Sequence, residues 1–166
     1  MTTTISDIKL ETINPRWIDN SSKIPKFLKI KKSLIDKKGK GVFAKYNIKK
    51  GTFLGHYMGK ISNDNKKGPY IFHTIINNKT VSIDATDINY SNWTRYMNCS
   101  INKENENIIS YKLQNKETYL IKNQYKSLQG YIVFYANRDI KKGEELLYYY
   151  GDYYAKLMNI KYNLKE

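Results

Sequence analysis

The chain has 166 residues, 40% of them hydrophobic, which fits one domain with a modest core and excludes a wholly disordered chain. Its single cysteine, Cys99, excludes an intrachain disulfide framework and a thiolate-rich zinc cluster. The formal charge of +14 indicates attraction to polyanions.

Short β-strands separated by glycine turns dominate the predicted elements. After an N-terminal extension over residues 1–26, β-branched and aromatic residues alternate with polar ones, which predicts strands. A hairpin is predicted around the turn at 77–79. The predicted strands cover 27–34, 42–48, 52–61, 70–76, 80–85, 108–113, 117–121 and 130–140, and a short aromatic segment covers 146–151.

Two short helices complete the prediction. Residues 91–100 favour one, with Ser91 as its N-cap, and apolar residues spaced by three or four favour another over 152–162. These patterns predict a mostly β domain over 27–157, and residues 158–166 are interpreted as a C-terminal tail.

The positive charge has two explanations. Lys, Asn, Ile and Tyr make up 81 of the 166 residues and all have AT-rich codons, so nucleotide bias alone would produce a lysine-rich chain. The 26 lysines stand beside only 3 arginines, and Arg is the preferred reader of phosphate and guanine. We therefore expect nonspecific contact with DNA or nucleosomes rather than sequence-specific reading.

Four glycine- and tyrosine-rich motifs follow one another along the chain. They read "DKKGKG" (36–41), "IKKGTFLGHYMG" (48–59), "NWTRYMNCS" (92–100) and "RDIKKGEELLYYYG" (138–151). Taken singly each is weak: most Gly-x-Gly pairs are ordinary turns, and a tyrosine cluster is equally explained by core packing. Their order makes the set specific.

In this order the motifs resemble the SET-domain protein lysine methyltransferases, and most closely the PR/SET (PRDM-type) subgroup. The resemblance covers about residues 28–157. It implies a β-clip-like SET fold of several small sheets, with a threaded pseudoknot where segments 92–100 and 146–151 cross, and a C-terminal helix. It also implies S-adenosylmethionine as methyl donor, a histone or another lysine-containing protein as substrate, and no metal.

The resemblance also implies roles for single residues. Tyr150 stands in the place of the catalytic tyrosine that orients the substrate amine, and Tyr57 matches a tyrosine that lines the lysine channel. Tyr148 matches the position that tunes the number of methyl groups, and a tyrosine there favours mono- or dimethylation. The implied cofactor contacts are Lys38, Lys40, Tyr70, Asn98 and Cys99.

Cys99 stands where many members of the family have histidine. No base lies beside it in sequence, and the chain has only His56 and His73, so a buried or cofactor-facing cysteine is favoured over a nucleophile. Arg95 and Glu145 are predicted to be structural.

The chain departs from the family pattern in three places. "NHSCxPN" becomes "NCSINKENEN", a Glu-Tyr pair becomes His56-Tyr57, and no cysteine-rich segment follows Gly151. In many members that segment binds zinc and covers the site. Here Tyr153 and Tyr154, or a second subunit in a homodimer, would cover it. Small viral SET proteins also lack this zinc-bound lid, and an AT-rich composition suits such a genome.

Two other functions stay open: a catalytically weak PR/SET-type chromatin or protein-interaction module, and a basic nucleic-acid protein that uses the fold as a scaffold. We find no signal-peptide pattern and no run of about 18 apolar residues, so we expect a soluble intracellular protein, away from membranes and in the nucleus or on chromatin. A cationic histone tail would be repelled by a basic chain unless local acids formed a groove. The candidates are Asp84, Asp87, Asp139, Glu144 and Asp152.

Overall fold

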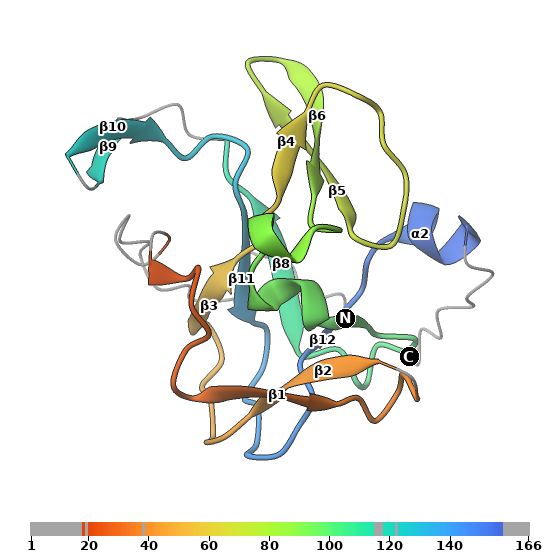
Figure 1. Ribbon diagram of the computed structural model, residues 1–166. Helices are drawn as coiled ribbons and strands as arrows, with labels where there is room; N and C mark the ends of the chain where they lie inside the picture. Colours follow the sequence, from red (N-terminus) through yellow and green to blue (C-terminus); the bar gives the residue numbers. More distant parts are fainter. Residues whose placement is uncertain (1–17, 19, 38, 115–117, 122, 158–166) are drawn as a thin grey trace.

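Small β-sheets make up most of the computed structural model, which describes residues 18, 20–37, 39–114, 118–121 and 123–157 (Figure 1). The strands in chain order are β1 (Leu28–Lys32), β2 (Lys40–Ala44), β3 (Phe53–His56), β4 (Lys60–Ser62), β5 (Ile71–Ile76), β6 (Lys79–Asp84), β7 (Asn98–Cys99), β8 (Ile108–Lys112), β9 (Thr118–Ile121), β10 (Gln124–Ser127), β11 (Ile132–Ala136) and β12 (Leu147–Tyr148). The helices are the 3-10 helices η2 (Ile88–Tyr90) and η3 (Trp93–Tyr96) and the α-helix α2 (Asp152–Leu157). The predicted mostly β class is confirmed.

The strands pair into antiparallel sheets of two or three strands and one parallel pair. β1 pairs with β2, β9 with β10, and β11 lies between β3 and β8. β6 lies between β4 and β5, and β12 runs parallel to β7. None of the helices in the described part of the chain is long and apolar enough to cross a membrane.

The predicted hairpin around residues 77–79 is confirmed. Asn77 and Asn78 connect β5 to β6 with φ of 50° and 62°, a left-handed pair that matches the twist of the two strands. A second hairpin joins β9 to β10 through Asn123, with φ of 61°. Its second strand was not predicted, because "QYKS" is too short and too polar to show an alternating pattern.

The segment predicted as one strand over 52–61 is two strands with a corner between them. A Cβ on Gly59 would lie 2.5 Å from the backbone oxygen of Asp84, so the corner fits against β6 only because residue 59 has no side chain. The corner turns the chain from the central sheet of β3, β11 and β8 into the sheet of β4, β6 and β5.

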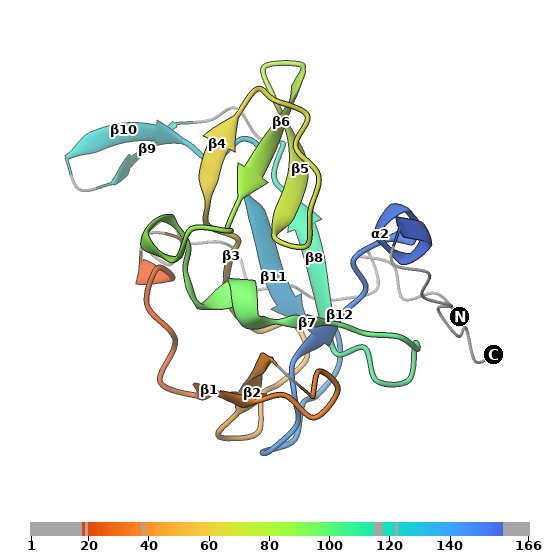
Figure 2. The same ribbon diagram turned by 45° about the vertical axis from the view of Figure 1, so that its right-hand side comes forward.

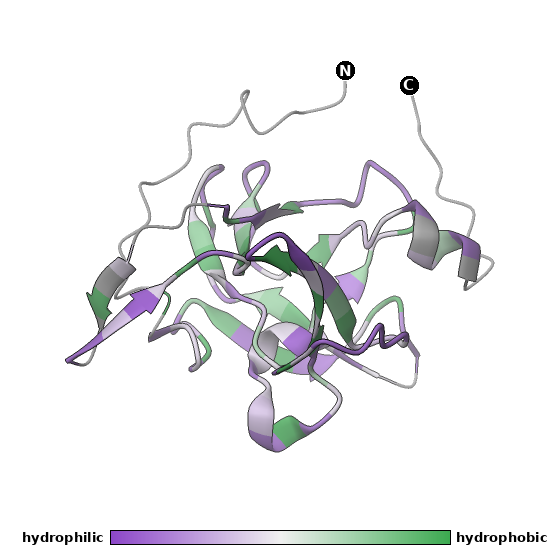
Figure 3. Ribbon diagram, turned by 90° about the horizontal axis from the view of Figure 1, so that it is seen from above, coloured by the Kyte–Doolittle hydropathy of each residue, from purple (hydrophilic) through white to green (hydrophobic). Residues whose placement is uncertain are grey.

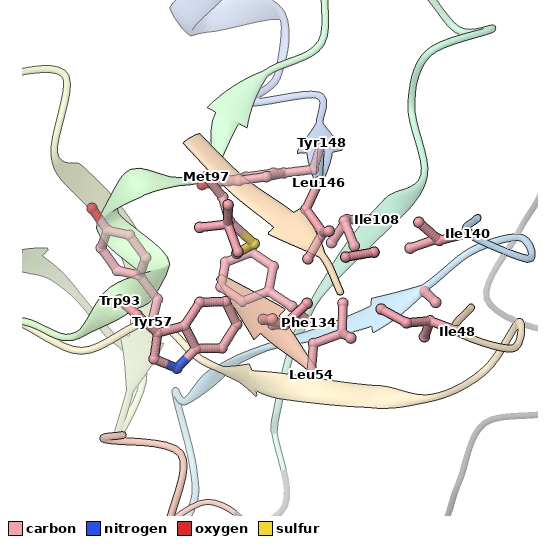
Figure 4. Close-up of a cluster of buried hydrophobic side chains, with 14 of the residues drawn as sticks. Ile48, Leu54, Tyr57, Trp93, Met97, Ile108, Phe134, Ile140, Leu146 and Tyr148 are labelled. Carbon is pink, nitrogen blue, oxygen red and sulfur yellow. The ribbon is translucent and has the colours of Figure 1, made fainter. Parts of the chain in front are cut away.

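A hydrophobic core fills the space between the sheets. Every residue of β11 is buried, as are Val42, Phe43 and Ala44 of β2. Figure 3 shows hydrophobic residues on the central strands and mostly hydrophilic residues along the outer loops. In Figure 4, Ile48 and Ile140 lie at one end of the main cluster, and Tyr57 and Trp93 lie at the other.

The threaded crossing implied by the family resemblance is present. Leu147 pairs with Asn98 and Tyr148 with Cys99, so the C-terminal aromatic segment lies beside the "NWTRYMNCS" segment (Figure 2). On its other side, Asn107 donates its backbone N–H to Leu147 O at 3.0 Å and accepts from Leu147 N at 2.8 Å. Leu147 and Tyr148 are therefore held between β7 and Asn107, both of which lie far from them in the sequence.

The helical predictions were partly wrong. Residues 91–100 form a 3-10 turn followed by β7, and the residue that caps η3 is Asn92, whose Oδ1 accepts from Thr94 N at 3.1 Å. Ser91 instead ends η2. The C-terminal helix is described over Asp152–Leu157, and its predicted continuation to 162 lies outside the described residues.

Candidate active site

Five aromatic side chains from separate elements form a continuous wall. Tyr57 follows β3, Phe72 lies on β5, Tyr148 on β12, Tyr150 just after β12, and Tyr154 on α2. Successive ring centroids are 4.7 Å apart for Tyr57 and Phe72, and 6.1 Å for Phe72 and Tyr148. They are 4.6 Å apart for Tyr148 and Tyr150, and 4.8 Å for Tyr150 and Tyr154. Such edge and offset contacts hold each ring in a fixed orientation.

This wall borders an open cavity of about 510 Å³, which we call the tyrosine cavity. All five aromatic residues line it, together with Asn65, Lys67, Gly68, Pro69, Ile71, His73, Arg95 and Lys112. The three tyrosines with implied catalytic roles, Tyr57, Tyr148 and Tyr150, are thus brought together at one surface although more than 90 residues separate the first from the others.

The hydroxyls of two of these tyrosines are anchored to backbone oxygens. Tyr57 OH donates to Tyr70 O at 2.8 Å, and Tyr150 OH donates to Met97 O. Burial raises the pKa of Tyr57 well above its usual value, although the nearby Arg95 partly opposes this shift.

Burial also keeps Tyr148 and Tyr150 in the neutral form. Desolvation raises the pKa of both well above 10, and nearby ionisable groups, Tyr150 for Tyr148 and Cys99 for Tyr150, reinforce the shift. All three hydroxyls are therefore protonated at neutral pH. They can donate and accept hydrogen bonds, but they do not act as phenolate bases.

Asn98, Lys40 and Cys99, predicted to contact the cofactor, lie beside the crossing rather than in the tyrosine cavity. The Asn98 amide donates to Lys40 O at 2.9 Å, to Ser33 Oγ at 3.1 Å and to Glu145 Oε1 at 3.0 Å. The Asn98 amide therefore ties the glycine-containing turn at 36–41 to β7. Lys38, the other lysine of this turn with an implied cofactor role, lies outside the described residues.

The carboxylate of Glu145 organises this region. It is buried, and besides the Asn98 amide it accepts from Ser33 Oγ at 2.7 Å and from Leu34 N at 2.9 Å. A Cβ on Gly41 would lie 2.2 Å from Glu145 Oε1, so the glycine leaves the space that the carboxylate occupies. The structural role predicted for Glu145 is confirmed.

Cys99 is half-buried, and burial raises the pKa of its thiol. Its Sγ donates to Ser100 O at 3.4 Å. Neither described histidine is placed to activate it, since the His56 ring bonds to Ser21 Oγ and the His73 ring bonds to Lys66 O. The thiol lacks the environment of a catalytic nucleophile, in line with the interpretation from sequence.

Arg95 has a larger role than the sequence indicated. Its guanidinium donates to Ala85 O at 3.0 Å and to Thr86 O at 3.1 Å, the predicted structural contacts, but it also lines the tyrosine cavity. It lies 4.5 Å from the ring centroid of Tyr70 and 5.0 Å from that of Tyr96.

Tyr96 was not predicted as a site residue, and Lys40 Nζ also lies 5.6 Å from its ring. A stack of cations and aromatic faces of this kind suits a ligand that carries both a carboxylate and flat or cationic groups. The signal was present in "NWTRYMNCS", where Arg and Tyr adjoin within the motif.

His56 and Tyr154 lie in different surroundings. His56 does not line the tyrosine cavity; its ring stacks on Tyr131 at 5.5 Å and borders a separate cavity of about 400 Å³. Tyr154 lies over Tyr150, as expected for a terminal helix that covers the site. The side chain of Tyr153 lies outside the described residues.

Comparison with known proteins identifies the fold and the family. The family model of the PR domain of PR domain zinc finger protein 2 matches residues 28–161. The chain belongs to the PR/SET family. The resemblance inferred from the four motifs, and the SET fold it implied, are thereby confirmed.

Several curated relatives of this PR/SET chain are named as lysine methyltransferases. It is 32% identical over 131 residues to the Caenorhabditis elegans histone-lysine N-methyltransferase set-1, covering 69% of this chain and 47% of that protein. It is 30% identical over 160 residues to the Xenopus tropicalis N-lysine methyltransferase KMT5A, covering 89% of this chain and 43% of that protein. The chain spans less than half the length of these two relatives.

Solved structures agree with this fold. The methyltransferase domain of human PR domain-containing protein 2 superposes with a TM-score of 0.63 at 24% identity, over 91% of this chain and 90% of that one. A chain of ctPRC2 in an autoinhibited conformation bound to S-adenosylmethionine matches with a TM-score of 0.53 at 26% identity, over 80% of this chain and 16% of that one.

Proposed function

We propose that residues 27–157 form a SET domain that transfers methyl groups from S-adenosylmethionine to lysine side chains of proteins. The observation that carries this proposal is the convergence of Tyr57, Tyr148 and Tyr150 on the tyrosine cavity. Histones are the substrate that the names of the relatives favour, and chromatin in the nucleus is the location expected with that substrate. A viral origin and a homodimer stay predictions from the sequence.

The residues beside the cavity fit this cofactor chemically. Arg95 and Lys40 offer positive charge for a carboxylate, and the rings of Tyr70 and Tyr96 offer faces for an adenine or a sulfonium. We propose that Lys40, Tyr70, Asn98 and Cys99 hold S-adenosylmethionine, with Lys38 as a further contact from the same turn. When bound, the cofactor supplies an electrophilic methyl group on its sulfonium sulfur.

The tyrosines orient the substrate amine. A reacting lysine must be neutral so that its lone pair can attack, and hydroxyls held as neutral donors and acceptors can fix the direction of that lone pair. Tyr150, anchored to Met97 O, and Tyr57, anchored to Tyr70 O, present hydroxyls whose positions are set by backbone. Because burial raises their pKa values, the amine proton leaves to solvent through the open cavity rather than to a tyrosine.

Tyr148 limits the number of methyl groups. Its ring is buried between Phe134, at 5.0 Å, and Tyr150, at 4.6 Å, so it cannot move aside for a bulkier amine. A hydroxyl at this position restricts rotation of a methylated amine, which favours mono- or dimethylation.

Two measurements test this function. Calorimetric titration with S-adenosylmethionine and S-adenosylhomocysteine should show saturable binding, weakened by Asn98→Ala, and isotope-labelled cofactor should label core histones or nucleosomes. Absence of cofactor binding at millimolar concentration would contradict the proposal. Specific histone-peptide binding without cofactor binding would favour a PR/SET interaction module instead.

A further inference from the structure

The formally charged side chains around the tyrosine cavity are all positive. Lys67 comes from the loop between β4 and β5, Arg95 from η3, and Lys112 from the end of β8. No Asp or Glu is among the described residues that line this cavity. Three separate elements therefore contribute cations, and none contributes a compensating acid.

None of the five acids that the sequence suggested for an acidic groove lines the tyrosine cavity. Asp84 forms an ion pair with Lys66 at 3.0 Å, and Asp87 forms one with Lys60 at 3.6 Å. The other three contact groups away from the cavity: Asp139 accepts from Lys50 N, Glu144 pairs with Arg138, and Asp152 accepts from Tyr149 OH. An acidic groove, which the sequence left open, is therefore not formed by these five side chains at the tyrosine cavity.

The positive charge of the cavity is not neutralised within the described part of the chain. The contacts of Arg95 are to backbone carbonyls and aromatic rings, which leave its charge in place. Lys67 and Lys112 are exposed, and neither lies within ion-pair distance of a described carboxylate. An entering substrate therefore meets a positive field.

We propose that the tyrosine cavity accepts a lysine that lies in an acidic stretch of its substrate protein, with carboxylates beside the target residue meeting Lys67 and Lys112. This inference rests on the proposed function and narrows its substrate class. A free histone tail, which carries many positive charges, is disfavoured relative to an acidic sequence.

The electrostatics support this choice in two ways. Carboxylates of the substrate near Lys67 and Lys112 add attraction both in steering and in the bound complex, whereas basic neighbours add repulsion. The cations around the cavity also disfavour a second positive charge, so they favour the neutral form of the target amine that can react. Nucleic acid is the weaker alternative, because three cations around a cavity of side-chain size offer few phosphate contacts.

Binding of two matched peptides tests the proposal directly. Each has one lysine, flanked on both sides by Asp and Glu in one peptide and by Arg in the other, and each carries a fluorophore for anisotropy. We expect the wild-type chain, saturated with S-adenosylhomocysteine, to prefer the acidic peptide by about tenfold, and this preference to shrink at high salt. Lys67→Glu/Lys112→Glu should abolish or invert the preference.

A control variant separates local from overall charge. Lys45→Glu/Lys49→Glu changes the net charge equally at exposed positions outside both cavities, and it should keep most of the preference. Equal loss in the two double variants would overturn the proposal, as would equal affinity of the wild type for both peptides. A loss of S-adenosylhomocysteine affinity in Lys67→Glu/Lys112→Glu would assign these lysines to the cofactor and would also overturn it.

The same experiment distinguishes this inference from the proposed function. Acidic-peptide preference without methyl transfer to any substrate would support the inference about charge and contradict catalysis. Methyl transfer that is equally efficient on both peptides would support catalysis and contradict the inference about charge. Displacement of the acidic peptide by a short DNA duplex at lower concentration than by unlabelled acidic peptide would assign the cations to nucleic acid.

Discussion

Replacing Glu145 should destabilise the fold more than any change at the neighbouring Glu144. The Glu145→Ala variant leaves the buried Ser33 hydroxyl and the Leu34 N–H without their acceptor. The Asn98 amide loses one acceptor but still donates a hydrogen bond to Lys40 O. An unsatisfied buried donor such as the Ser33 hydroxyl costs about 1–3 kcal/mol, and the bond from the more exposed Leu34 adds about 0.5–1.5 kcal/mol, so we expect a loss of about 2–4 kcal/mol in the free energy of unfolding. That is a large share of the roughly 5–15 kcal/mol of an ordinary domain.

Glu144 provides the matched comparison. Its ion pair with Arg138 is 3.1 Å long, but both side chains are about one-third exposed, at 32% and 38%, so Glu144→Ala should cost only about 1 kcal/mol or less. Urea denaturation followed by circular dichroism measures both changes. If Glu145→Ala does not fold, Glu145→Gln, which keeps the volume and one acceptor, should still lose about 1–3 kcal/mol.

Equal losses of unfolding free energy in Glu145→Ala and Glu144→Ala would refute the role of Glu145 as an organising acceptor. The role also predicts a second effect, since Glu145 connects the Ser33–Leu34 backbone to β7. Cofactor affinity of Glu145→Gln should therefore fall even at temperatures where the variant remains folded. Glu144→Ala should bind the cofactor as the wild type does.

Three further outcomes are expected. Tyr148→Phe should shift the product of methyl transfer toward trimethyl-lysine, read by mass spectrometry, and an unchanged product ratio would contradict its limiting role. Hydrogen bonds from Thr86 hold the pKa of Asp84 at about 2, below its usual 3.8, so its stabilising contribution is present above pH 4 and lost as pH falls to 2. Asp84→Asn should therefore flatten the pH dependence of unfolding across that interval. Because burial raises the pKa of Cys99, its alkylation at pH 8 should be slower than that of a free cysteine, and Cys99→Ser should retain methyl transfer at saturating cofactor; loss of activity under that condition would restore a chemical role.

The sequence predicted elements whose signals are local. The hairpin at 77–79 needed residues that tolerate positive φ, and two asparagines supply them. Alternating apolar and polar residues also located β1, β5 and β6, although burial does not alternate along them: only Leu28 of β1 is buried, and Val81, Ser82 and Ile83 of β6 are buried in succession. Such features depend on residues that are neighbours in the sequence, so the amino-acid sequence alone is sufficient to predict them.

Features set by contacts distant in sequence were not predictable in this way. The break at Gly59 follows from its approach to Asp84, 25 positions away, and the cap by Asn92 in place of Ser91 follows from bonds to the backbone of residues 21 and 56. The crossing of β7 and β12 came from the family resemblance alone, because a two-residue parallel strand carries no periodic signal.

The candidate site likewise has a part that the sequence predicted and a part that depends on contacts distant in sequence. The tyrosines of the family motifs could be named from the sequence, and the structure brings Tyr57, Tyr148 and Tyr150 to one cavity. Phe72, Arg95 and Lys112 join them from a strand, a 3-10 turn and another strand end, with no shared pattern. The charge of the cavity could not be predicted, because it depends on which acids pair elsewhere.

Methyl transfer by Tyr150→Phe, measured beside the wild type, tests whether the tyrosine cavity is a catalytic site. Both proteins would be given isotope-labelled S-adenosylmethionine with nucleosomes, core histones and the acidic peptide, and cofactor affinity would be measured on each. We expect label on lysine from the wild type and a rate about 100-fold lower in Tyr150→Phe, with cofactor affinity nearly unchanged. Equal labelling by the two proteins, or no label from a wild type that binds the cofactor, would contradict it.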